Sequence, residues 1–375
     1  MTNNLNELLT TDKIKEICLK FGINGDFLGF ERVHNGHIND TFAVYFMRDV
    51  ERKEYILQKL NTFVFKKPEE LMDNITSVTE YIRARIKETR ATAKRYVLHY
   101  QYTDSGKGFY IDGNGGFWRC CKYIDDSVTF NETDDLTVIR EAGKAFGEFQ
   151  RLLADYPVKK LYITIPHFHN TIDRYRLFRE AAASDVCGRK AGVIKEINDY
   201  FAFEELATKM YKMQRAGELP LRVTHNDTKC NNVLFDGETH EHLAVIDLDT
   251  VMPGLTAFDF GDAIRFIANT CAEDENDLSQ VKLDLSKYEA FTGGFVSEIK
   301  HSITENEKNT MALGALTMTV ECGMRFLTDY LNGDVYFKVG YPDHNLVRSR
   351  CQLALAKDMC ANLDKMNEIV EKYCK

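Results

Sequence analysis

The sequence predicts an α+β fold with a small β-rich N-terminal lobe and a larger, mainly helical C-terminal lobe. Runs of alternating, β-branched and aromatic residues recur as far as residue 124, whereas apolar residues with a 3.6-residue period dominate from residue 136 onward. The chain has 375 residues, of which 44% are hydrophobic. A chain of that size can bury a large core and usually divides into two units, which we place at residues 1–122 and 123–375.

The N-terminal lobe is expected to begin with a helix and three strands. Residues 6–21 have helical spacing, and Gly22 is a plausible stop. The predicted strands are residues 27–33, 41–48 and 54–60, with the polar turn HNGHIND at 34–40 between the first two. Backbone N–H groups in such a loop can bind nucleotide phosphates, although an Asn-Gly turn is also an ordinary hairpin turn.

A helix is predicted next over residues 68–82, because Pro68 and the acidic Glu69 and Glu70 suit a helix N-terminus. Further elements follow from the same patterns. Strands are expected at 96–102, 108–111 and 117–124, and helices at 136–153, 200–214 and 311–331, the last ending at Asn332-Gly333.

The most informative segments are THNDTKCNN at 224–232 and AVIDLD at 244–249. Between them the sequence reads as strand 233–236, polar turn and strand 243–246. A turn centred between residues 239 and 240 would put Asn232 opposite Asp247, about 5 Å away. Magnesium prefers oxygen ligands and is often held by one or two side chains plus substrate phosphates. Asn232 and Asp247 are therefore the predicted metal ligands.

Asp227 lies on the loop that leads into this hairpin, where a general base would be needed. Lys229 can offer a point charge to a transferring phosphate, and His225 is expected to brace the loop by hydrogen bonding. Each residue alone could belong to a solvated polar turn. Together their spacings favour phosphoryl transfer from a magnesium nucleotide.

Composition limits the other possibilities. The net charge of −9 argues against a nucleic-acid or anionic-membrane partner, since both require a basic surface. Ten cysteines are scattered without metal-ligand spacing, which favours reduced thiols, and Cys230 is expected to be a packed thiol. No basic-then-apolar leader and no apolar run of about 20 residues is present, so a cytoplasmic location is expected.

At these motifs the sequence resembles the aminoglycoside phosphotransferase and choline kinase family, whose two-lobe fold is similar to that of protein kinases. HxDxxxxN followed by IDxD carries this resemblance. It is closer to the bacterial N-acetylhexosamine 1-kinases, through HNDTKxNN, VIDLDTVMPG, FDFGDAIR and MRFLTDYLNGDVYFK, with NGHINDTF and YILQKLN upstream. The resemblance implies ATP-dependent phosphorylation of the anomeric C1 hydroxyl of N-acetylglucosamine or N-acetylgalactosamine.

The resemblance also implies where ATP and Mg²⁺ bind, with ATP between the N-terminal nucleotide-binding lobe and the C-terminal catalytic lobe. Lys59 is assigned to the phosphates, but many relatives have the basic residue one place earlier, at Gln58. Only one of the two can face the nucleotide, because strand side chains alternate. Glu69 or Glu70 could pair with the lysine. The implied ATP-binding residues are His34, Asn35, Gly36, His37, Asn39, Thr41, Lys59 and, in the interlobe connection 121–125, Tyr123.

For the acceptor, the resemblance implies sugar contacts from Arg325 and Tyr336, in addition to Asp227. Arg325 has Glu321 and Asp329 four residues to either side, so a salt-bridge ladder on the helix surface is the alternative. Asp249 is expected either to support the metal site or to bind a sugar hydroxyl. Asp259 and Asp262 are expected to brace the catalytic loop.

Other functions stay open. A kinase of the same fold could act on choline, an aminoglycoside or homoserine, and a nucleotide-binding module without catalysis is a further possibility. A protein kinase fits less well, since the chain has neither GxGxxGxV nor an Ala-Pro-Glu segment. A metal hydrolase is disfavoured by the lack of a second histidine at ligand spacing. The expected partners are ATP and a small sugar acceptor, with no nucleic acid and no membrane.

Overall fold

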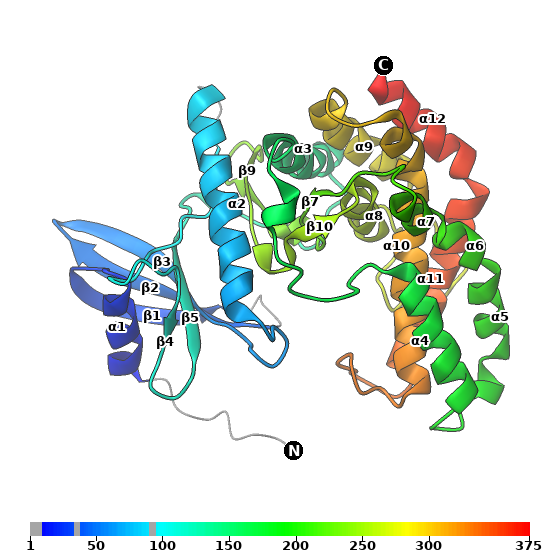
Figure 1. The fold of residues 1–375 in the computed structure, drawn as a ribbon, viewed down its shortest axis with the longest axis horizontal. Coiled ribbons are helices and arrows are strands. Elements are labelled where there is room, and N and C mark those ends of the chain that lie inside the picture. Colours follow the sequence, from blue (N-terminus) through cyan, green and yellow to red (C-terminus); the bar gives the residue numbers. More distant parts are fainter. Residues whose placement is uncertain (1–9, 34–37, 90–94) are drawn as a thin grey trace. The chain divides into compact units, whose positions relative to one another are not determined.

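A computed structural model describes residues 10–33, 38–89 and 95–375 (Figure 1). The chain forms two compact units. Unit 1 comprises Met1–Ser127 and Leu161–Thr164, and unit 2 comprises Val128–Lys160 and Ile165–Lys375.

Unit 1 is built on a five-stranded antiparallel sheet with the order β1-β2-β3-β5-β4. Its three long strands and the strand at 117–122 confirm the predicted elements. The segment 96–102 is not a strand, since it contributes only an isolated bridge between Tyr100 and Cys121. The strands are β1 (Asp26–Val33), β2 (Asp40–Arg48), β3 (Glu51–Lys59), β4 (Tyr110–Ile111) and β5 (Phe117–Lys122).

Two helices accompany this sheet. Helix α1 (Thr11–Lys20) lies against the sheet (Figure 1). It starts after Thr10, whose hydroxyl accepts a hydrogen bond from Lys13 N, and Ile14 and Ile17 belong to the sheet core. Residues 6–9 of the predicted helix lie outside the described residues. Helix α2 (Pro68–Thr89) begins as predicted and extends beyond residue 82.

The predicted hairpin of unit 2 exists, but its register differs from the prediction. Val233 pairs with Val245, so Asn232 lies opposite Ile246, and Asp247 follows the last pair. Asp236 accepts hydrogen bonds from Glu238 N and Thr239 N, which centres the turn one residue earlier than predicted. A β-bulge between Leu234 and Phe235 then shifts the pairing by one residue. The hairpin strands are β8 (Val233–Asp236) and β9 (His242–Val245), with β6 (Ser127–Val128) beside β8; β7 (Arg222–Thr224) pairs separately with β10 (Met252–Gly254).

The helices of unit 2 form its main core. The predicted helix 136–153 is confirmed, whereas the predicted helix 200–214 is broken into three shorter ones. The helix predicted at 311–331 begins earlier, behind a capping box made by Thr304 and Glu307. The helices are α3 (Leu136–Leu152), α4 (Thr171–Ser184), α5 (Ile194–Ala202), α6 (Glu204–Ala207), α7 (Lys209–Arg215), α8 (Thr256–Ile267), α9 (Leu285–Ile299), α10 (Glu305–Leu331), α11 (His344–Ala361) and α12 (Leu363–Cys374).

Helix α8 is central to this unit because glycines let α10 approach it closely (Figure 1). A Cβ atom on Gly261 would lie 2.3 Å from the carbonyl oxygen of Gly314. This close packing makes α8 a rigid platform for the loop that precedes β8. Within the described residues, no helix combines the length and the apolar character of a membrane span. All ten cysteines are free thiols.

Candidate active site

Asp259 of α8 anchors the loop at 225–232 by hydrogen bonds to its backbone. The two carboxylate oxygens of Asp259 accept hydrogen bonds from His225 N at 2.9 Å and Asn226 N at 2.8 Å. Burial raises the pKa of Asp259, although these donors and the His225 ring oppose the rise. Asn226 has a positive φ of 64°, which an asparagine tolerates well. The predicted bracing role of Asp259 is confirmed.

Asp262, one turn further along α8, braces the same loop. Its Oδ2 accepts a hydrogen bond from Thr228 N at 3.0 Å, and its Oδ1 accepts one from Arg265 at 2.9 Å. Burial acts to raise the pKa of Asp262, but the Arg265 guanidinium outweighs it and holds the pKa below its usual value. Arg265 also donates to Glu273 at 2.9 Å. This bracing was predicted for Asp262, whereas Arg265 and Glu273 were not singled out.

His225 braces the loop as predicted. It is fully buried, its Nε2 lies 2.8 Å from the carbonyl oxygen of Ile246, and its Nδ1 accepts a hydrogen bond from Asp227 N at 3.2 Å. A proton on Nε2 satisfies both contacts. The imidazole therefore links the start of the loop to the end of β9.

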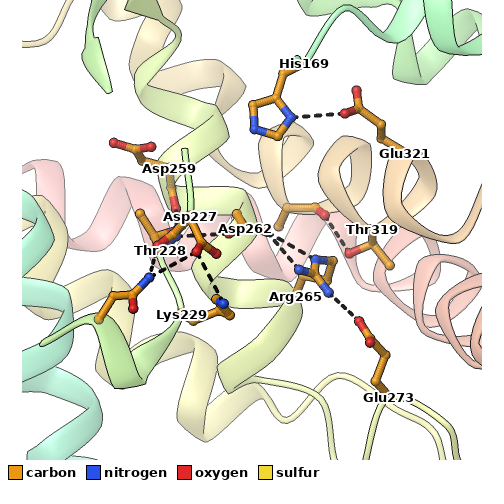
Figure 2. Close-up of polar contacts among 12 residues, drawn as sticks. His169, Asp227, Thr228, Lys229, Asp259, Asp262, Arg265, Glu273, Thr319 and Glu321 are labelled. Atoms are coloured by element: carbon orange, nitrogen blue, oxygen red, sulfur yellow. Dashed lines mark hydrogen bonds and ion pairs between the residues drawn. The ribbon is translucent and has the colours of Figure 1, made fainter. Parts of the chain in front are cut away.

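Asp227, Lys229 and Asn232 form one hydrogen-bonded cluster. The Asn232 amide donates to the Asp227 carbonyl oxygen at 2.8 Å and to its Oδ2 at 3.2 Å. Lys229 Nζ lies 3.3 Å from the same Oδ2 (Figure 2). The Asp227 and Lys229 side chains are 29% and 32% exposed, so a ligand can reach both. The cluster offers a base, a cation and an amide within one loop.

Lys229 is surrounded by acidic groups. Burial acts to lower its pKa, but the carboxylates of Asp227, Asp247 and Asp262 outweigh burial and hold the pKa above its ordinary value. Lys229 is therefore an ammonium ion at neutral pH. The same interactions place the charge of Asp247 near this cluster, even though Asp247 does not pair with Asn232.

The residues present suit a magnesium ion. Both Asn232 amide hydrogens are directed at Asp227, and Asn232 Oδ1 accepts no hydrogen bond from any residue within the described ranges. An amide oxygen and a carboxylate are the oxygen donors that magnesium prefers. Asp247 has the left-handed conformation, with φ 59°, just before the short 3-10 helix Leu248–Thr250. Asp249 lies in that turn and is 4% exposed.

Arg325 does not join a salt-bridge ladder on α10, so that alternative is wrong. Glu321 bonds His169 and Thr171 instead. Asp329 accepts hydrogen bonds from the backbone N–H groups of residues 335–337. The Arg325 guanidinium carbon lies 5.9 Å from the ring centroid of Tyr336 and 5.4 Å from that of Phe337. The hydrogen-bond donors of Arg325 thus have no acceptor in the part of the chain that the structure describes.

The structure also places several residues predicted to bind ATP. His34, Asn35, Gly36 and His37 lie outside the described residues. Asn39 Oδ1 accepts a hydrogen bond from Asn61 N at 2.9 Å, and Thr41 accepts one from Gln58 at 3.1 Å. The side chain of Tyr123 is 37% exposed just after β5.

Lys59 and Gln58 lie on opposite faces of the sheet. Lys59 Nζ lies 5.7 Å from the ring of Trp118, which belongs to the core beneath α1. Gln58 accepts a hydrogen bond from Arg119 of β5 at 2.9 Å. The sequence did not suggest Arg119 as a cation on this face, because it comes from a separate strand.

The acidic residues proposed to pair with Lys59 have other partners. Glu70 lies 3.0 Å from Lys67, and Glu69 lies 4.0 Å from Lys107. Among the residues described in the structure, Lys59 makes no ion pair with either of them.

Comparisons with known proteins concern the family and the fold of the chain. A family model described as the phosphotransferase enzyme family matches residues 30–289. The microcompartment-associated aminopropanol kinase is similar with a TM-score of 0.63 at 14% identity, covering 96% of this chain and 99% of that chain. Choline kinase from Cryptosporidium parvum is similar with a TM-score of 0.57 at 15% identity, covering 97% and 99%. An aminoglycoside phosphotransferase from Alicyclobacillus acidocaldarius has a TM-score of 0.60 at 10% identity, covering 96% of each chain. At such identities the likeness concerns the fold, and the predicted protein-kinase-like fold is confirmed.

Proposed function

Because the chain belongs to the phosphotransferase enzyme family, we propose that it transfers the terminal phosphate of ATP to the anomeric hydroxyl of an N-acetylhexosamine. The observation that carries the proposal is the cluster of Asp227, Lys229 and Asn232 on a loop clamped by α8. Phosphoryl transfer depends on positioning and charge stabilisation more than on covalent chemistry. This cluster supplies both.

In the proposed reaction, Asp227 accepts the proton of the C1 hydroxyl. The hydroxyl oxygen forms a bond to the terminal phosphorus while the bond to the bridging oxygen of ADP breaks, so the products are a sugar 1-phosphate and ADP. The Lys229 ammonium offsets charge on the transferred group. Asn232 and Asp247 would hold Mg²⁺, which neutralises nucleotide phosphates when it is bound.

The acceptor side of the proposal draws on Arg325. A guanidinium donates several directed hydrogen bonds, and those of Arg325 have no acceptor among the described residues. Hydroxyl and acetamide oxygens are suitable partners. Tyr336 and Asp249 complete the proposed sugar contacts. The proposed ATP contacts in the described part of unit 1 are Asn39, Thr41 and Tyr123. Lys59 is not among them, because its side chain lies on the face of the sheet opposite to Gln58 and Thr41.

The test is magnesium-ATP consumption with N-acetylglucosamine, N-acetylgalactosamine, glucosamine, galactosamine and choline, with the product identified by phosphorus NMR. We expect turnover with the acetylated sugars and a phosphorus signal coupled to the anomeric proton. Turnover with choline and with none of the sugars would contradict the sugar assignment and support an amino-alcohol kinase. No turnover with any acceptor would favour a nucleotide-binding module.

A further inference from the structure

A second guanidinium, that of Arg174, lies near Arg325. Arg174 belongs to the first turn of α4, and its only hydrogen bond in the described structure runs from Nη2 to the carbonyl oxygen of Phe168 at 2.9 Å. Its Nε is buried and has no hydrogen-bond partner. Neither Arg174 nor Arg325 has an ion pair with any described residue. A cation near a helix N-terminus is also disfavoured by the helix dipole.

The charge balance around the two guanidiniums is positive. Glu321, which is 1% exposed, is a carboxylate that acts on both of them, whereas Asp173 acts on Arg174 but is paired with Arg176 at 2.8 Å. The oxygens of Glu321 are occupied by His169 Nδ1 at 3.0 Å and Thr171 Oγ1 at 2.9 Å. Because the charge of Asp173 is balanced by Arg176, the two guanidiniums and Glu321 together carry one net positive charge.

The protonation states support this count. Burial acts to raise the pKa of Glu321, but His169, Arg174 and Arg325 outweigh it and hold the pKa below its ordinary value. Burial, and next the charge of Arg325, lower the pKa of Arg174. An arginine stays charged despite such a shift. Glu321 is therefore a carboxylate at neutral pH, and the two arginines repel each other.

This cluster adjoins the catalytic loop. His169 acts electrostatically on Asp262, which holds Thr228 N directly after Asp227 (Figure 2). On the other side, Tyr336 is 72% exposed, stacks on Arg325, and its phenol acts on Arg174. His169 and Glu321 thus connect the two guanidiniums to the reacting loop, and Arg325 also lies against the exposed ring of Tyr336, where part of an acceptor can reach it.

We propose that Arg174 determines acceptor specificity, binding together with Arg325 an oxygen of the acceptor that carries partial or full negative charge. The inference rests on the proposed function, in which that oxygen is the carbonyl of the acetamido group. The carbonyl oxygen has two lone pairs that accept hydrogen bonds, and a planar guanidinium group presents several N–H donors toward such an oxygen. An ammonium group at the same place would meet the surplus positive charge, so deacetylated sugars and amino alcohols bind less well.

The test compares N-acetylglucosamine with glucose, which has the same anomeric hydroxyl and no acetamido group. In Arg174→Gln we expect the KM for N-acetylglucosamine to rise about tenfold, with the KM for ATP and the kcat/KM for glucose within about twofold of wild type. Arg174→Lys keeps the charge but loses the planar fork, so its KM should be intermediate.

Arg179→Gln is the matched control, because Arg179 lies on the same helix, is exposed and pairs with Glu204. This variant should leave the KM for N-acetylglucosamine and the kcat/KM for glucose at their wild-type values. Equal losses for both sugars in Arg174→Gln, or an unchanged preference for the acetylated sugar, would overturn this inference alone. Faster wild-type turnover of glucosamine or choline than of N-acetylglucosamine would overturn the charge argument directly. Absence of turnover with every acceptor would overturn the proposed function as well.

Discussion

Lys229 is the cation of the candidate active site, and acidic groups hold it in place. Its Nζ lies 3.3 Å from Asp227 Oδ2, and the charges of Asp247 and Asp262 also act on it. The surrounding carboxylates keep the ammonium charged and restrict its position. In the proposed reaction this charge faces the transferred phosphate, where preorganised charge contributes most to rate.

Replacing Lys229 with Met should therefore lower kcat about a hundredfold, with a smaller effect on the KM for ATP. Steady-state kinetics with N-acetylglucosamine would measure both. Lys209→Met, at an exposed position of α7, is a suitable control. If Lys229→Met turned over as fast as the control, the lysine would have only a structural part in the loop.

Sequence spacing grouped the candidate catalytic residues because they are close in the chain. Asp227, Lys229 and Asn232 lie within one loop, so their grouping required little tertiary information. The sequence did not suggest the role proposed for Arg174, because that role depends on α4 packing beside α10. The proposed ladder between Glu321 and Arg325 was wrong for a related reason: Glu321 is bonded to His169, which is 152 residues away in sequence.

At the scale of elements, a buried ionic cluster joins α3 to β9. His242 Nδ1 lies 2.7 Å from Glu141, and its Nε2 lies 3.2 Å from Glu148. Burial acts to raise the pKa of Glu141, but the hydrogen bonds and charges of His242 and Lys144 lower it to about 2 from an ordinary 4.5. This depressed pKa means that the carboxylate stabilises the fold above pH 4.5 and that the contribution is lost as the pH falls toward 2.

Glu141→Gln should lower the free energy of unfolding by about 1–3 kcal/mol at neutral pH. The difference from wild type should shrink as the pH falls below about 4.5, because protonation removes the same charge from the wild type. Urea unfolding at several pH values would measure it. A difference that stayed constant from pH 7 to pH 3 would show that the carboxylate charge is unimportant.

The close contact of α8 with α10 gives a second prediction at this scale. A Cβ on Gly261 would lie 2.3 Å from the Gly314 carbonyl oxygen, so Gly261→Ala must push the helices apart. We expect a loss of about 3 kcal/mol or more in unfolding free energy. Gly192→Ala, where a Cβ meets nothing within 4 Å, should change stability by less than about 0.5 kcal/mol. If Gly261→Ala were as stable as Gly192→Ala, the contact between α8 and α10 would be looser than the structure shows.

Elements were predictable where local pattern and packing agree. The hairpin strands and α3 follow from their periodicity, but the register of the hairpin depended on the side-chain hydrogen bonds of Asp236 in the turn and on a β-bulge between Leu234 and Phe235. The segment 200–214 has a helical period, yet it breaks at Phe203 and Thr208 between three short helices. Periodicity alone does not reveal such breaks, since the same residues suit one helix or several.

At the scale of the whole molecule, the β-rich and helical parts of the sequence correspond to two compact units. One detail could not be predicted from the sequence: the segment Leu161–Thr164 belongs to unit 1, although the residues on both sides of it belong to unit 2. The Asn74 side chain accepts a hydrogen bond from Tyr162 N at 2.8 Å and donates one to Tyr162 O at 2.9 Å. A contact between residues 88 positions apart leaves no local signal. The protein-kinase-like fold was accessible only through the motifs that resemble known kinases.

The central claim is that the loop around Asp227 transfers phosphate from ATP to a hydroxyl group. The most direct test is Asp227→Asn, which preserves the size of the side chain and removes the base. We predict that this variant binds ATP within about twofold of wild type by calorimetry and phosphorylates N-acetylglucosamine at least about a hundredfold more slowly. Near-normal sugar phosphorylation by Asp227→Asn would contradict the account.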